Sequence, residues 1–157
     1  MPVNTIEEAK ALIERWMDNR YPKKDLPPSD MDNFRFASET ALGIGFSVHQ
    51  PKSHVDFVVL RARILFDPDH IQKMGSLDIK DRDDFLWDLK GKLLFWPPHF
   101  EFEFDKQKLP TAIKFYVEIS FDELTIGKLQ DAINQITRCL LWAAWSFAHQ
   151  FGVQEGE

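Results

Sequence analysis

The sequence predicts an α+β fold: a two-layer sandwich with helices on one face of a five-stranded, mainly antiparallel sheet. Two observations carry this prediction. Several segments repeat apolar residues at steps of three and four, as amphipathic helices do, and five others alternate apolar and polar residues, as half-buried strands do. Packing each apolar stripe on the apolar face of the sheet buries both. The 157 residues have no low-complexity segment and fit a single domain over residues 1–157.

The first helix is predicted over residues 5–20. Thr5 and Glu8 have the spacing of a capping box, which favours a helix start at Thr5. Its apolar stripe contains Ile6, Ala9, Ile13 and Trp16. Tyr21-Pro22 ends the helix, because a residue before proline disfavours the α conformation. Residues 21–32 form a charged, proline-rich loop that we expect to lack regular structure.

Strands follow from Asn33 onward. Phe34 and Phe36 begin the alternation, and Leu42, Ile44, Phe46 and Val48 continue it with glycine, serine and histidine between them. Residues 55–66 form a third strand, so these three make an antiparallel meander. Residues 99–105 and 112–120 form a second hairpin.

Two helices are predicted between the meander and this hairpin. Asp67-Pro68 starts a short helix that runs to Met74, since the acid is a good N-cap and proline suits the first helical position. A longer helix begins near Asp78 or Asp81 and stops at Pro97-Pro98. Its predicted core face consists of the aliphatic stem of Arg82 with Leu86, Leu89, Leu93 and Trp96.

The last helix, over residues 125–151, is the segment around which the rest is organised. Its first half has one apolar stripe, whereas its second half, around Leu141, Trp142 and Trp145, is apolar over most of its circumference. Such a helix needs cover on more than one side. Either the first helix, through Ile13 and Trp16, or another chain supplies that cover. The complete order is α-β-β-β-α-β-β-α.

Composition excludes some classes of function. The formal net charge of −6 argues against nucleic-acid binding, which needs clustered Lys and Arg. The single cysteine, Cys139, forms no intrachain disulfide and is typical of a reducing cytoplasm. We expect a soluble protein with no signal peptide, no membrane span and a disordered tail over residues 152–157.

No motif indicates a catalytic, metal or cofactor site. The five histidines are scattered over several elements, and no pair has helical ligand spacing. The acidic run from Asp78 to Asp84 lacks the glycine and terminal glutamate of a calcium loop, so helix capping explains it better. Glu101 and Glu103 are interpreted as cross-strand ion-pair partners of Lys114, Arg61 or Arg63 rather than as paired catalytic carboxylates.

The outer sheet face gives a further candidate surface. Gly43, Gly45 and Ser47 leave one strand face almost bare, which permits close approach of a backbone or a flat ligand. The neighbouring charged and apolar residues on this predicted face are Phe57, Val59, Arg61, Arg63 and Tyr116. The alternative interpretation is a bend in a twisted strand beside ordinary solvated arginines.

This order of elements, with its long amphipathic last helix, resembles the type III secretion chaperone-like fold shared with YbjN-like domains. The resemblance covers residues 6–151 and is one of architecture, not of motif. It implies a small, acidic, cytoplasmic and commonly dimeric protein without catalytic residues, and the secretion chaperones hold extended partner segments on their surface. The aromatic content and the loop over residues 21–32 depart from the secretion chaperones and weaken the inference of client binding.

Two functions are therefore predicted. The first is a non-catalytic protein-interaction module, acting as a homodimer or binding a protein or peptide through the sheet face or the end of the last helix. The alternative is a small-molecule-sensing domain with a pocket between sheet and helices or on the bared sheet face. An enzyme is not expected, because no nucleophile is paired with a base in the sequence pattern.

Overall fold

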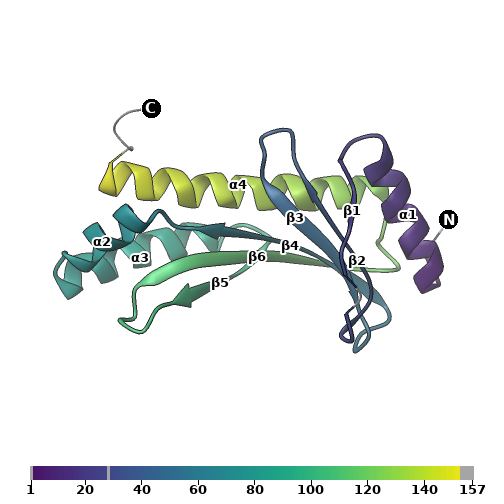
Figure 1. Ribbon diagram of the computed structural model, residues 1–157, viewed down its shortest axis with the longest axis horizontal. Helices are drawn as coiled ribbons and strands as arrows, with labels where there is room; N and C mark the ends of the chain where they lie inside the picture. The colour runs from purple at the N-terminus through teal and green to yellow at the C-terminus, as the bar shows by residue number, and fades with distance from the viewer. Residues whose placement is uncertain (1, 28, 153–157) are drawn as a thin grey trace. The chain divides into compact units, whose positions relative to one another are not determined.

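A computed structural model describes residues 2–27 and 29–152 and has the predicted α+β fold (Figure 1). The helices are α1 (Ile6–Asp18), α2 (Pro68–Gly75), α3 (Ile79–Leu93) and α4 (Ile126–Phe151). The strands are β1 (Lys24–Asp25), β2 (Asp32–Glu39), β3 (Gly45–Pro51), β4 (Phe57–Leu65), β5 (His99–Phe104) and β6 (Pro110–Ser120). The predicted helix starts are confirmed at three caps, where the side chains of Thr5, Asp67 and Thr125 accept backbone N–H bonds.

The sheet has six strands in the order β1-β2-β3-β4-β6-β5, one more than predicted. The additional strand lies in the loop over residues 21–32, where Lys24 pairs with Ala37 and Asp25 with Phe36, antiparallel to β2. The expectation that this loop lacks regular structure was therefore wrong for three residues: Lys24 and Asp25 of β1, and Asp32, with which β2 begins. Backbone pairing with the edge of β2 requires no side-chain periodicity, so the pattern gave no signal for it. Pro28, in the same loop, lies outside the described residues.

The strand predicted from Leu42 begins later, at Gly45. The Gly43 N–H bonds to the Thr40 carbonyl at 2.9 Å, and Gly43 has a φ of +77°, a left-handed conformation that glycine adopts readily. Residues 40–44 thus form the turn between β2 and β3, and Leu42 is 70% exposed instead of facing the core. The apolar alternation ran on through the turn, which is why the sequence reading placed the strand start too early.

The chain divides into two compact units, and the first comprises Met1–Ala62 and Tyr116–Ile136. Its core includes the rings of Trp16, Tyr21 and Phe46, whose centroids lie 5.1 to 6.0 Å apart. The Trp16 Nε1 and the Tyr21 hydroxyl both donate to Oε1 of Gln130, over 3.2 and 2.9 Å. These bonds attach α1 to the first half of α4.

The second unit comprises Arg63–Phe115 and Thr137–Glu157. Phe66 stacks on Phe147 with ring centroids 3.9 Å apart, and Phe85 of α3 meets the same ring edge-on at 5.1 Å. Lys73 of α2 donates to the Phe151 carbonyl at the end of α4, where a cation complements the helix dipole. β4, β6 and α4 each contribute residues to both units, and the single domain over residues 1–157 remains a prediction.

The segment after α3 differs from the prediction. Trp96 was expected on the core face of a helix running to Pro97, but α3 ends at Leu93. Leu94, Phe95 and Trp96 are instead 73%, 90% and 38% exposed. A residue before proline is displaced from the α conformation, so the helix ends before the stripe reaches Trp96. Of the tail predicted over residues 152–157, only Gly152 is described; residues 153–157 lie outside the described chain.

Candidate functional site

Within the second unit, α3 and the second half of α4 line a hollow of about 310 Å³. Figure 1 shows these two helices side by side. From α3 the hollow is lined by Phe85, Asp88, Leu89 and Lys92, and from α4 by Trp142, Trp145, Ser146, His149 and Gln150. It is therefore a groove between two helices, whereas the small-molecule prediction placed a pocket between sheet and helices.

A second hollow of about 220 Å³ adjoins the first, and Trp142 and Trp145 line both. Its remaining walls are Trp96, Arg138 and Leu141. The structure thus brings together the three α4 residues predicted to bind a partner. We call the combined surface the aromatic groove; it consists of Asp88, Lys92, Trp96, Arg138, Leu141, Trp142 and Trp145.

The three predicted residues differ in exposure. Leu141 and Trp142 are partly buried, but Trp145 is 63% exposed. Sequence reasoning considered Ile13 and Trp16 of α1 as cover for the second half of α4. In the structure, Trp16 instead bonds to Gln130, which lies in the first half of that helix. In the second half, α3 lies beside the helix and covers part of Trp142. A large aromatic surface around Trp145 remains in contact with water.

Charged groups border the aromatic groove. The Lys92 ammonium lies 4.6 Å from the centroid of the Trp142 ring, a cation–π contact. Arg138 adds a second cation, and Asp88 adds an acid. The Nε1 of Trp142 is buried and has no acceptor among the described residues. The groove therefore combines apolar rings with charges of both signs.

Sequence reasoning missed the contribution of α3 to this surface. Asp88 and Lys92 lie four residues apart on α3, so they share one face of that helix, and Phe85 and Leu89 line the same hollow beside them. That spacing was the available signal. Sequence reasoning considered only the core face of this helix and made no prediction for Asp88 or Lys92.

The second predicted surface is only partly assembled. Gly43 lies in a turn, and Gly45 is the first residue of β3, so the bare strand face does not extend to Gly43. Phe57, Val59 and Arg61 lie on β4, where Val59 pairs with His49 and Arg61 with Ser47, but Val59 is only 4% exposed. Tyr116 lies on β6 and is partly buried.

Arg63 belongs to the second unit, and its Nε donates to Glu103 Oε2 over 2.5 Å. This bond confirms the interpretation of Glu103 as a cross-strand ion-pair partner. Because the Arg63 guanidinium is already paired with the Glu103 carboxylate, it is a weaker candidate for ligand binding on the predicted sheet-face surface.

Metal-ligating and thiol side chains are the remaining groups of the described chain that could carry chemistry. Over residues 2–27 and 29–152, no group of three or more His, Cys, Asp or Glu side chains could hold a metal ion. Asp78 occupies the N-cap position of α3, although its side chain makes no capping bond. Cys139 is buried, and burial raises the pKa of its thiol to about 11, so it is a poor nucleophile at neutral pH. Among the helices described, none is long and apolar enough to cross a membrane.

Comparison with known proteins adds a family match and fold neighbours. A family model described as an uncharacterized conserved protein, DUF2299, matches residues 9–147. No curated protein matches the chain. An uncharacterized protein from Methanothermobacter thermautotrophicus has a similar crystal structure, with a TM-score of 0.84 and 19% identity over 92% of this chain and 99% of that one.

Two further solved structures are more distant. A chain of the HopA1–SchA chaperone–effector complex matches with a TM-score of 0.50 and 14% identity, over 85% of this chain and 91% of that chain. YbjN from E. coli matches with a TM-score of 0.47 and 12% identity, over 96% of this chain and 100% of that chain. The match to a chain of the chaperone–effector complex confirms, at the level of the fold, the architectural resemblance that the order of elements predicted.

Proposed function

We propose that this chain, which belongs to the DUF2299 family of uncharacterized conserved proteins, is a protein-interaction module that forms a homodimer through the aromatic groove. One observation carries the proposal: Trp145 is 63% exposed although it lies between two hollows lined by further aromatic side chains. Burying a side chain of this size contributes roughly 1.5 to 3 kcal/mol, so a partner that covers it gains affinity. Tryptophan in a partly formed pocket is the usual anchor of such interfaces.

The charges of the groove favour a second copy of the chain as the occupant. A two-fold dimer places the same surface on both sides, so each charge meets residues of its own surface. Because the surface carries two cations, Lys92 and Arg138, and one acid, Asp88, a two-fold arrangement allows a cation of one copy to meet Asp88 of the other. The cations of the groove thus lie on a chain whose overall net charge is −6, which reduces the general repulsion between two copies at this surface.

The fold neighbours support a protein as the partner. One of them is a chain of a chaperone–effector complex, in which a protein binds another protein. The fold likeness does not transfer that partner, and it makes an extended protein segment the competing occupant of the groove. We propose no catalytic role for the groove, and we propose a cytoplasmic protein, since its single cysteine is a buried free thiol.

Light scattering coupled to size-exclusion chromatography tests the dimer. We expect a mass of about twice the 18.4 kDa of one chain, and a shift toward the monomer in Trp145→Gln. Trp87→Gln is the matched control, because Trp87 is 78% exposed on α3 and does not line the groove. A wild-type monomer throughout the micromolar range contradicts the homodimer and favours a separate protein segment. A dimer that Trp145→Gln leaves intact shows that a different surface forms the contact.

A further inference from the structure

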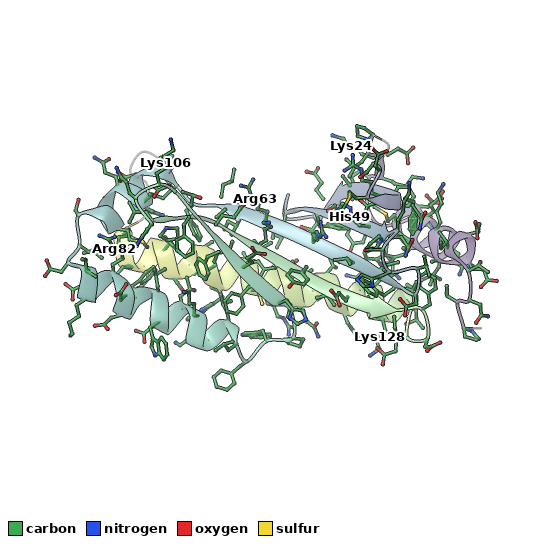
Figure 2. All side chains as sticks on the ribbon, turned by 90° about the horizontal axis from the view of Figure 1, so that it is seen from below. Lys24, His49, Arg63, Arg82, Lys106 and Lys128 are labelled. Atoms are coloured by element: carbon green, nitrogen blue, oxygen red, sulfur yellow. The ribbon has the colours of Figure 1, made fainter. Side chains whose placement is uncertain are left out.

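Three polar side chains form a hydrogen-bonded row in the first unit, outside the aromatic groove. Ser47 Oγ lies 2.7 Å from Nε2 of His49, and Nδ1 of His49 lies 3.2 Å from Oδ2 of Asp32. Ser47 and His49 are two residues apart on β3 and share one face of the strand, while Asp32 begins β2 (Figure 2 labels His49). The side chains of His49 and Asp32 are only 10% and 14% exposed.

The chemistry of the three groups fixes the direction of the hydrogen bonds. An ionised carboxylate only accepts hydrogen bonds, so Nδ1 of His49 carries the ring proton and donates a hydrogen bond to Asp32. Nε2 of the neutral ring is then an acceptor, and the Ser47 hydroxyl donates to it. Burial lowers the pKa of His49, and Arg61 and Arg35 lower it further, against the raising effect of the hydrogen bond and the charge of Asp32. The ring is therefore neutral at neutral pH, the form that acts as a base.

Ser47 has space beside it on the sheet surface. Ser47 is partly exposed. Gly45, two residues earlier on the same face of β3, has no side chain. A Cβ built on Gly45 would meet no atom closer than the Ser38 carbonyl oxygen at 4.0 Å. Across the strands, Ser47 pairs with Ala37 on β2 and with the exposed Arg61 on β4. Small groups thus lie on one side of Ser47 and a guanidinium on the other.

We propose that Ser47 is a nucleophile toward small carboxylic esters that carry an anionic group, with His49 as general base, Asp32 as the residue that positions His49, and Arg61 as the binder of the anion. Oγ adds to the carbonyl carbon while its proton passes to Nε2. The bond between the carbonyl carbon and the leaving alcohol then breaks, and His49 returns the proton to the departing oxygen. Water repeats these steps, which releases the carboxylic acid and restores Ser47. The activity is independent of the dimer proposed above.

A fluorophosphonate probe tests the nucleophile on the full chain. Attack by Ser47 forms a phosphonyl ester on Oγ and expels fluoride, and peptide mapping locates the adduct. We expect one adduct, on Ser47, that Ser47→Ala abolishes. Ser53→Ala is the control, since Ser53 is exposed in the turn after β3. His49→Gln should slow labelling about 100-fold or more, the usual contribution of a general base. No adduct at Ser47 in the folded wild type, or an equal rate in folded His49→Gln, overturns the proposal.

Two further measurements do not depend on whether His49→Gln folds. The wild-type labelling rate should rise with pH as His49 loses its proton and should level off by neutral pH, because burial lowers the pKa of His49, and the facing Arg61 and Arg35 charges lower it further against the raising effect of Asp32. Asp32→Asn should slow labelling and move this rise to lower pH, which a merely structural role would not do. A labelling rate that keeps rising well into alkaline pH contradicts His49 as the base.

The preference between two 4-nitrophenyl esters tests the role of Arg61. We expect the wild type to prefer the succinate monoester over the acetate and Arg61→Met to abolish this preference. No such preference in the wild type contradicts the role of Arg61.

Discussion

At the scale of single residues, His49 links the stability of the first unit to pH. Its pKa is lowered in the folded chain, first by burial and then by Arg61 and Arg35. The unfolded chain therefore binds more protons in the window below pH 6.5, its ordinary value, and unfolding is favoured as the pH falls through that window. The contribution of His49 to stability is fully present where the ring is neutral in both states and fully lost where it is protonated in both, so the pH dependence is confined to the window between the two pKa values.

We predict that the wild type loses more unfolding free energy between pH 7 and pH 5 than His49→Gln does. Glutamine has no titrating group but retains hydrogen-bonding capacity, so the difference between the two slopes isolates the imidazole. Denaturant unfolding at several pH values measures it. Equal slopes for both proteins would show that His49 has the same proton affinity in the folded and unfolded chain.

Residue-level sequence reasoning succeeded where the signal was local. Thr5 was identified from its capping-box spacing and Asp67 from the proline that follows it, and the last helix was predicted to start at Thr125; all three side chains accept backbone bonds at helix starts. The row of Ser47, His49 and Asp32 was missed because Asp32 is brought to His49 only by the pairing of β2 with β3. A bulge between Asp32 and Phe34 shifts that register, and no local pattern reports it.

At the scale of elements, the start of α4 depends on one hydroxyl. Thr125 Oγ1 accepts the Lys128 N–H over 3.1 Å and satisfies a backbone donor that the helix itself leaves free. We predict that Thr125→Ala lowers the free energy of unfolding by about 1 kcal/mol, whereas Thr125→Ser, which keeps the acceptor, has a much smaller effect. Chemical denaturation measures both. An alanine variant as stable as the wild type would mean that another group replaces the cap.

Element-scale predictions held for the presence of every long helix and for the strands β4, β5 and β6, because each has a clear period, although α3 ends earlier than predicted. They failed where elements end inside a continuing apolar pattern. Leu42 and Trp96 both extend an apolar series in sequence, yet both lie outside their element and are exposed. The exposed Trp96 then becomes a wall of the aromatic groove, so this failure marks part of the candidate site.

At the level of the whole molecule, the order of elements was enough to predict the α+β class and the resemblance to a chaperone-like fold. The pairing of β1 and the division into two compact units were beyond it, since both depend on contacts between distant segments. The sequence did locate Trp142 and Trp145 as the place where α4 needs further cover. In the structure, α3 covers part of Trp142, whereas Trp145 stays exposed.

The central claim is that a second copy covers Trp145, and hydroxyl-radical footprinting of the wild type tests it most directly. In a single chain Trp145 and Trp87 are exposed by 63% and 78%, so a monomer should oxidise both at similar rates. Our account predicts that, at concentrations where the mass is that of a dimer, Trp145 is oxidised several-fold more slowly than Trp87. If Trp145 reacts as fast as Trp87 in the dimer, the aromatic groove is not the surface through which this protein associates.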